Sequence, residues 1–147
     1  MSTSLLSPDA LEFDLPVSGA DAVITRVAQR LAEHPDVLDF PHLLEELRAR
    51  ERLTSTVLGH GIAIPHARTT SVRQIVMAAG CSREGVWFES SQQKIHLLFV
   101  IGVPPHMVRE YLALLSQLTR RLKDAGVREK LLQADSAGAF LTALDLQ

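Results

Sequence analysis

Residues 50–68, RERLTSTVLGHGIAIPHAR, concentrate side chains that bind anions close to one histidine. Arg50 and Arg68 can form charge-assisted and bidentate hydrogen bonds with a phosphoryl group. The hydroxyls of a Thr-Ser-Thr run, including Ser55 and Thr56, can donate hydrogen bonds to phosphate oxygens. These residue types, gathered within one short stretch of chain, predict an anion-binding site.

The histidine in this segment, His66, directly follows Pro65 at the end of a short apolar run, which predicts a position at a strand end. Gly59 and Gly61 allow the preceding backbone to turn tightly and to approach a ligand. A neutral imidazole, with an ordinary pKa of about 6.5, is a competent nucleophile. Held through one ring nitrogen among cations and donors, it can accept a phosphoryl group and release it again. A histidine at a strand end is more often structural, so composition leaves both interpretations open.

Hydrophobic spacing predicts the elements that must position this segment. Ser18 and Asp21 resemble a capping box that opens a helix ending before Pro35, and a second helix begins near Asp39 with Pro41 in its first turn. Further along we expect a loop leading into a short strand within 54–64, strands at 74–81 and 94–103, and between them a turn into a short edge segment at 85–88. Helices are expected from 106 to 122, with Leu112 on a broad apolar face, at 127–132 and at 136–144. Because helices flank a central group of strands, the predicted fold class is α/β or mixed α+β, with the sheet sandwiched between helices.

Length and composition limit the classes of protein that this chain can be. Its 147 residues are sufficient for one domain, 1–147, and 46% of them are hydrophobic, which is enough for a core. The net charge of −2 argues against a nucleic-acid partner. No apolar run approaches the roughly 20 residues of a membrane span, and the N-terminus is unlike a signal peptide. Cys81 is the only cysteine, so no internal disulfide forms, and we expect a cytoplasmic protein.

The ordered run GHGIAIPHAR, preceded by RERLTST, resembles the signature of the enzyme IIA family of the bacterial phosphotransferase system. The fructose/mannitol type, and within it the nitrogen-regulatory (PtsN-like) branch, is the nearest in pattern. The resemblance extends over nearly the whole chain, because the two leading helices, the KIHLLFV strand, the Leu-rich helix and the closing REKLL segment follow in the expected order.

This resemblance implies a fold, a chemistry and a set of partners. The family fold is a mixed sheet between helices, and the histidine of its Pro-His pair, here His66, accepts a phosphoryl group on Nε2 from an HPr-type phosphocarrier protein. Arg50 matches the arginine of the family's Arg-Glu pair, which lies near the phosphohistidine. Transport members pass the group to a cysteine of an enzyme IIB domain, whereas regulatory members act on other proteins such as a channel, a kinase or a transcriptional regulator. No cofactor is implied.

The chain departs from the family pattern at three positions. Thr54 replaces a glycine of the triplet, and Ala67 replaces the glycine after the active histidine, which is costly only where that backbone has positive φ. Tyr111-Leu112 stands where the family usually has His-Leu. Because a tyrosine hydroxyl can donate a hydrogen bond but cannot become cationic near pH 7, we expect His66 to be phosphorylated more slowly than in relatives with two histidines.

Several functions stay open at this point. The preferred one is a phosphohistidine carrier acting mainly in regulation. The alternatives are a binding module that has lost phosphotransfer, a stand-alone IIA subunit of fructose/mannitol-type uptake, and a metal-dependent hydrolase using His60 and His66. The last is weak, because the two histidines lack an H-E-x-x-H spacing, and we expect no metal site. Around the acceptor His66 the predicted supporting residues are Arg50, Ser55, Thr56, His60, Arg68 and Tyr111.

Overall fold

Six strands form one mixed sheet in the computed structural model, which describes residues 5–16, 19–53 and 56–146. The sheet has the order β1-β5-β6-β3-β2, and β4 also pairs with β6. Strands β5 and β6 form its long antiparallel centre, and β1, β3 and β4 join that pair in parallel. The strands are β1 (Leu11–Glu12), β2 (Val57–Gly59), β3 (Ile62–Ala63), β4 (His66–Arg68), β5 (Val76–Phe88) and β6 (Gln93–Val103).

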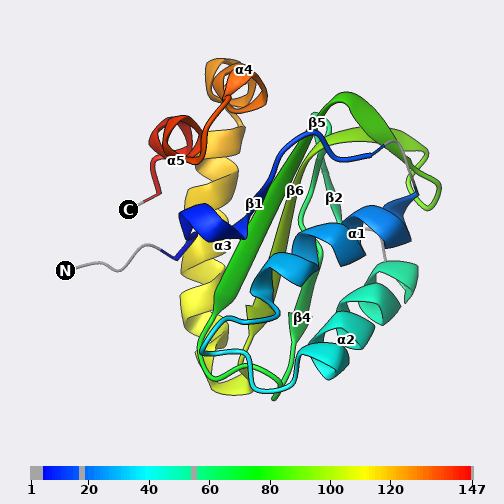
Figure 1. Ribbon diagram of the computed structural model, residues 1–147, viewed down its shortest axis with the longest axis vertical. Helices are drawn as coiled ribbons and strands as arrows, with labels where there is room; N and C mark the ends of the chain where they lie inside the picture. The colour runs from blue at the N-terminus through cyan, green and yellow to red at the C-terminus, as the bar shows by residue number, and fades with distance from the viewer. Residues whose placement is uncertain (1–4, 17–18, 54–55, 147) are drawn as a thin grey trace.

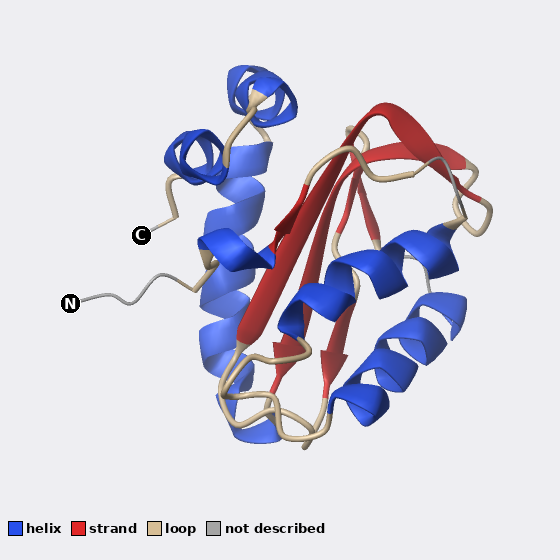
Figure 2. Ribbon diagram, viewed as in Figure 1, coloured by secondary structure: helices blue, strands red, loops and turns tan. Residues whose placement is uncertain are grey.

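Helices cover both faces of this sheet (Figures 1 and 2). Helices α1 and α2 lie on one side, while α3, α4 and α5 lie on the other. Residues such as Val27 of α1 and Leu118 of α3 are fully buried against the sheet. The predicted mixed α+β class, with the sheet sandwiched between helices, is confirmed. The helices are η1 (Pro8–Ala10), α1 (Ala20–Ala28), η2 (Gln29–Leu31), α2 (Phe40–Leu53), η3 (Pro105–Met107), α3 (Val108–Leu122), α4 (Ala125–Gln133) and α5 (Ala137–Leu144).

Two short strands, β3 and β4, lie one after the other along the same edge of β6. Ile62 of β3 is in register with Leu97, and His66 of β4 is in register with Ile101. Pro65 lies between the two strands and has no N–H to donate, but its carbonyl accepts a hydrogen bond of 2.9 Å from the Ile101 amide. The backbone on both sides of His66 is therefore anchored to the central strand of the sheet.

Local signals for helix ends agree with the structure where they can be compared. The Asp39 side chain accepts a hydrogen bond of 3.2 Å from the His42 amide, which places it as the cap of α2, with Pro41 in the first turn. Ser18, predicted to cap the first helix, lies outside the described residues, and α1 begins after Gly19.

Two expectations from the sequence are wrong. The predicted short edge segment at 85–88 is extended, but no turn separates it from the preceding strand: it is part of β5, because Gly85 has a φ of +92° and the register shifts between Cys81 and Val86 while pairing with β6 continues. Leu112 was expected on the buried face of the Leu-rich helix, but its side chain is 57% exposed. The buried face of α3 instead passes through Leu118 and Leu122.

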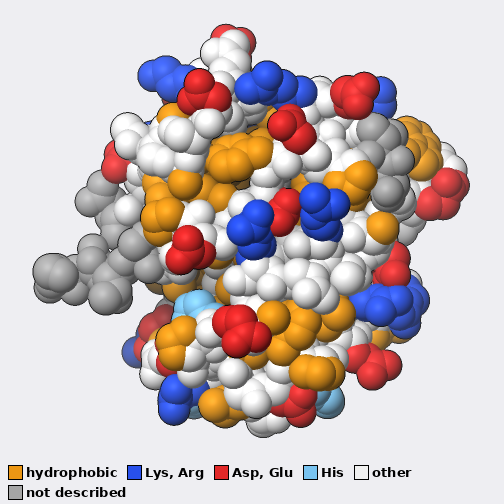
Figure 3. Space-filling view, in the orientation of Figure 1, with side chains coloured by type: hydrophobic (Ala, Val, Ile, Leu, Met, Phe, Trp, Pro, Cys, Tyr) orange, Lys and Arg blue, Asp and Glu red, His pale blue; other side chains and the backbone are white. Residues whose placement is uncertain are grey.

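The outer surface mixes charges of both signs. On the face seen in Figure 3, acidic and basic side chains alternate with small apolar areas. Within the described part of the chain, no helix combines the length and the apolar character that crossing a membrane requires.

Candidate functional site

His66 opens strand β4, and a backbone carbonyl fixes its partly exposed ring. Its Nδ1 lies 2.8 Å from the carbonyl oxygen of Ile64. Because a carbonyl oxygen can only accept, Nδ1 must bear the hydrogen, and in the neutral ring Nε2 then has the free lone pair. The geometry therefore presents Nε2 as the nucleophilic atom of the imidazole.

Tyr111, on the second turn of α3, faces this ring from across the site. The ring centroids of His66 and Tyr111 are 5.4 Å apart and the planes are tilted by 31°. Burial raises the pKa of the Tyr111 hydroxyl above its ordinary value, and the positive charge of Arg50 opposes that shift. The hydroxyl is thus protonated near neutral pH and can act as a hydrogen-bond donor.

Arg50 lies in the last turns of α2, and its charge acts on two of its neighbours. It lowers the pKa values of both Glu51 and Tyr111, although burial raises each pKa by more. Among the described residues no oxygen accepts a hydrogen bond from its guanidinium. A half-buried guanidinium whose charge reaches Tyr111 can bind an oxyanion near the facing rings of Tyr111 and His66.

Glu51 belongs to the site although the sequence analysis did not select it. Its side chain is only 6% exposed, and the Thr56 hydroxyl donates a hydrogen bond of 2.6 Å to its Oε1. Burial raises the pKa of the Glu51 carboxyl, while the Thr56 hydrogen bonds and the charges of Arg50 and His66 lower it. The available signal was its place beside Arg50 in the Arg-Glu pair of the resemblance.

Thr56 is tied to the site through its backbone as well as its side chain. Its carbonyl accepts a hydrogen bond of 3.0 Å from the Ile64 amide. Its hydroxyl hydrogen is directed at Glu51, so direct donation to a phosphoryl group requires that bond to break.

Arg68, Ser55 and His60 were also predicted around His66. Arg68 lies two residues after His66 on β4, on the same face of the strand, is exposed, and makes no hydrogen bond or ion pair with any described residue. Ser55, like Thr54, falls outside the described residues. His60 has a φ of +55° and lines a hollow of about 440 Å³ with Ser116 and Arg120 on the second half of α3 and with Lys123 just after it.

The metal hypothesis required His60 and His66 to share a site. The hollow that His60 lines contains neither His66 nor Tyr111. Across residues 5–16, 19–53 and 56–146, no group of three or more histidine, cysteine, aspartate or glutamate side chains is arranged to hold a metal ion.

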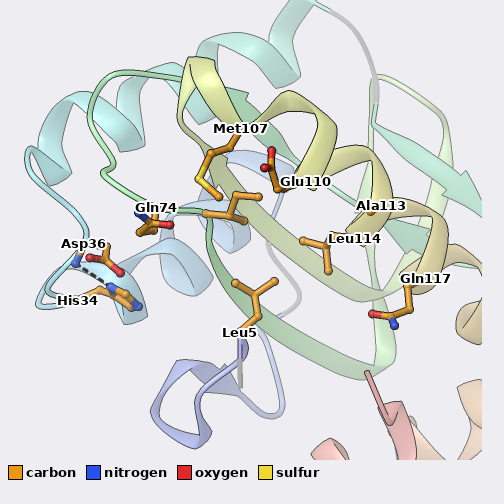
Figure 4. A pocket seen from close by; sticks show the side chains of 10 residues that line it. Leu5, His34, Asp36, Gln74, Met107, Glu110, Ala113, Leu114 and Gln117 are labelled. Carbon is orange, nitrogen blue, oxygen red and sulfur yellow. Dashed lines mark hydrogen bonds between the residues drawn. The ribbon is translucent and has the colours of Figure 1, made fainter. Parts of the chain in front are cut away.

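A separate hollow of about 680 Å³ lies beside the first half of α3 (Figure 4). Apolar side chains such as Leu5 and Met107 point into it, along with the acidic Glu110. On its floor the ring Nδ1 of His34 accepts a hydrogen bond of 3.0 Å from the Asp36 amide. Neither His66 nor Tyr111 lines it, so it is not part of the site.

Comparisons with known proteins show which proteins this chain is similar to. A nitrogen regulatory protein of Pseudomonas aeruginosa is 32% identical over 145 residues, which cover 97% of this chain and 94% of that protein. The 2-O-alpha-mannosyl-D-glycerate-specific EIIABC component of Escherichia coli is 30% identical over 97% of this chain, but the chain spans only 22% of its length. The crystal structure of nitrogen regulatory protein IIA-Ntr from Neisseria meningitidis matches with a TM-score of 0.85 and 31% identity, covering 95% of this chain and 96% of that one.

The family profile described as "Phosphoenolpyruvate-dependent sugar phosphotransferase system, EIIA 2" matches residues 4–146. This match spans nearly the whole sequence and includes every residue of the site. The chain therefore belongs to the EIIA 2 family of the phosphoenolpyruvate-dependent sugar phosphotransferase system.

Proposed function

We propose that this protein is a phosphohistidine carrier that accepts a phosphoryl group on Nε2 of His66 from an HPr-type phosphocarrier and acts mainly in regulation. The supporting observation is the 2.8 Å contact between His66 Nδ1 and the Ile64 carbonyl, which leaves Nε2 free in a partly exposed position. Membership of the EIIA 2 family supports the same chemistry.

The transfer needs no cofactor and no net gain or loss of a proton. The lone pair of His66 Nε2 attacks phosphorus, a nitrogen–phosphorus bond forms, and the corresponding bond in the donor phosphohistidine breaks with its electron pair returning to the donor nitrogen. The His66 ring becomes positively charged with its hydrogen still on Nδ1, where the Ile64 carbonyl accepts it. The unused donors of Arg50 and the Tyr111 hydroxyl stabilise charge on the transferring oxygens.

A regulatory role is supported by the relatives that match along their whole length. The Pseudomonas aeruginosa and Neisseria meningitidis proteins are both named nitrogen regulatory proteins and are matched over at least 94% of their own chains. Recipients in this role are regulated proteins such as a channel, a kinase or a transcriptional regulator. If the chain instead serves sugar uptake, as the name of the Escherichia coli relative indicates for that protein, the recipient is an enzyme IIB domain.

Intact-mass spectrometry at neutral to alkaline pH tests the proposal, because phosphohistidine is labile in acid. The protein is incubated with phosphoenolpyruvate, enzyme I and HPr, beside a His66→Ala control. The proposal predicts one added phosphoryl group that the control lacks.

A second candidate function is favoured by Tyr111, which stands where the resemblance expects a second histidine. In that case the fold is retained as a binding module that acts by contact and does not carry phosphate. No added mass with HPr proteins from several sources would support this alternative and contradict the first.

A further inference from the structure

Three consecutive hydrogen bonds connect a buried carboxylate with the ring of His66. The Thr56 hydroxyl donates to Glu51 Oε1 at 2.6 Å. The Ile64 amide donates to the Thr56 carbonyl at 3.0 Å, and His66 Nδ1 donates to the Ile64 carbonyl at 2.8 Å. We call this series, from Glu51 through Thr56 and Ile64 to His66, the Glu51 chain.

Two members of the Glu51 chain, Glu51 and Ile64, are buried. Glu51 is 6% exposed on the last turn of α2, and its second oxygen, Oε2, has no hydrogen-bond partner among the described residues. The Thr56 hydroxyl is therefore the hydrogen-bond donor to this carboxylate among the described residues, in a part-buried position where the bond is stronger than in water. Ile64 is 3% exposed and uses its amide and its carbonyl in the chain.

The last bond of the Glu51 chain decides which nitrogen of His66 can react. A shift of the Ile64 carbonyl away from Nδ1 would allow the hydrogen to move to Nε2, which would then have no lone pair for attack. Besides the anchoring of Pro65 to β6, Ile64 is held through its amide by the Thr56 carbonyl, and Thr56 is held through its hydroxyl by Glu51. The carboxylate can thus act on the reaction without touching the phosphoryl group.

We propose that Glu51 is a positioning residue, which acts through Thr56 and Ile64 to hold the His66 ring with its hydrogen on Nδ1 and its lone pair on Nε2. The proposal rests on the phosphoryl transfer proposed above, but the state of the ring can be measured without any transfer. It predicts that removing the acceptor at position 51 and removing the hydroxyl at position 56 have the same effect on the His66 ring.

Long-range ¹H–¹⁵N NMR of the ¹⁵N-labelled protein tests the state of the ring. In the unmodified chain the neutral His66 ring has its hydrogen on Nδ1 alone. In Glu51→Ala and in Thr56→Val we expect a mixture of the two tautomers and transfer from phosphorylated HPr slowed by about 10- to 100-fold, as for other outer partners that orient a functional histidine. Glu51→Gln, whose side-chain oxygen still accepts from Thr56, and Thr56→Ser keep the single tautomer and most of the rate.

A matched control is the hydrogen bond between Thr69 and Glu46, which lies on the same helix as Glu51. The Thr69 hydroxyl donates to Glu46 Oε1, which ties α2 to the segment after β4 but has no bond to Ile64. Thr69→Val removes a buried hydroxyl of the same kind, since Thr69 is 3% exposed. We expect it to leave the His66 tautomer unchanged, whatever its cost in thermal stability.

The outcomes separate this proposal from the proposed function. A single Nδ1–H tautomer and an unchanged rate in folded Glu51→Ala and Thr56→Val overturn the positioning role. If Thr69→Val also shows a mixture of tautomers, the positioning role is overturned, because the mixture then follows from a general loss of packing around α2. If the unmodified chain takes up no phosphoryl group but the two variants mix tautomers, the carrier function fails and the role of Glu51 in positioning the ring is supported.

Discussion

The ring of Tyr111 lies 5.4 Å from the ring of His66, centroid to centroid, with the two planes tilted by 31°. An aromatic hydroxyl therefore occupies the side of the site from which the resemblance expects a second imidazole. Tyr111 can donate one hydrogen bond but has no charge to offer near pH 7, whereas Arg50, whose positive charge acts on Tyr111, supplies a cation.

Replacing Tyr111 with histidine should accelerate phosphoryl transfer. A second imidazole adds a donor that can become cationic, and a gain of about 1.4 kcal/mol in transition-state stabilisation corresponds to roughly a tenfold faster rate. Rapid-quench measurement of transfer from phosphorylated HPr to the Tyr111→His variant gives that rate. Leu112→His, at the exposed neighbouring position on α3, is the matched control and should change little. An unchanged rate in Tyr111→His would show that a second imidazole at this position gives no advantage in transfer.

Arg50→Gln should slow transfer by about 100-fold, or ~2.7 kcal/mol, the cost typical of losing one donor to developing charge. Arg50→Lys should recover part of the rate, because an ammonium keeps the charge and loses the bidentate geometry. The control is Arg52→Gln, an exposed arginine on the same turn of α2. Single-turnover kinetics compare the three variants, and equal losses for Arg50→Gln and Arg52→Gln would contradict the role given to Arg50.

Glu51→Gln should stabilise the fold in a pH-dependent way. Burial raises the pKa of Glu51 in the folded protein, so the folded state holds this proton more tightly than the unfolded state. That contribution is fully present below the unfolded pKa of about 4.3 and is lost as pH rises through the folded pKa. The advantage of Glu51→Gln over the unmodified chain should therefore grow from pH 4 upward and then level off.

Urea unfolding of both proteins from pH 4 to pH 8 measures this difference. Glu45→Gln, at an exposed position of α2, provides the comparison for a carboxylate in water. A Glu51→Gln advantage that shrinks as pH rises has the opposite sign and would rule out the burial effect.

Ala67→Gly should weaken the fold without improving transfer. Ala67 is 5% exposed in the middle of β4, pairs with Gly102, and has no positive φ for a glycine to relieve. Glycine inside a strand costs about 0.5–1 kcal/mol relative to alanine through backbone entropy. Thermal unfolding should show a melting temperature lower by a few degrees. A rise in melting temperature would show that alanine is strained at this position.

Features that depend on neighbours in sequence were predictable. Asp39 and Pro41 mark the start of α2, and the apolar run at 94–103 becomes β6, because caps, proline geometry and apolar periodicity act over a few residues. Gly85 shows the limit of such signals. Its sequence context is typical of a turn, but its positive φ is absorbed by a register shift because pairing with β6 keeps the strand extended.

The candidate site has both local and non-local signals. His66 was selected from its proline and from the ordered motif, which are local. Glu51 was not selected, because its burial depends on how α2 packs in the folded chain, although its partner Thr56 is only five residues away. His60 was selected for its nearness in sequence, but the turn between β2 and β3 directs it toward the second half of α3.

Phosphorylation should place the phosphoryl group on Nε2 of His66 while Nδ1 keeps its hydrogen. The most direct measurement is NMR of the ¹⁵N-labelled protein after phosphorylation by enzyme I and HPr at alkaline pH, with phosphorus–nitrogen couplings used to locate the new bond. The account predicts one coupling, to Nε2 of His66. Coupling to Nδ1 of His66, or to a nitrogen of any other histidine, would contradict it.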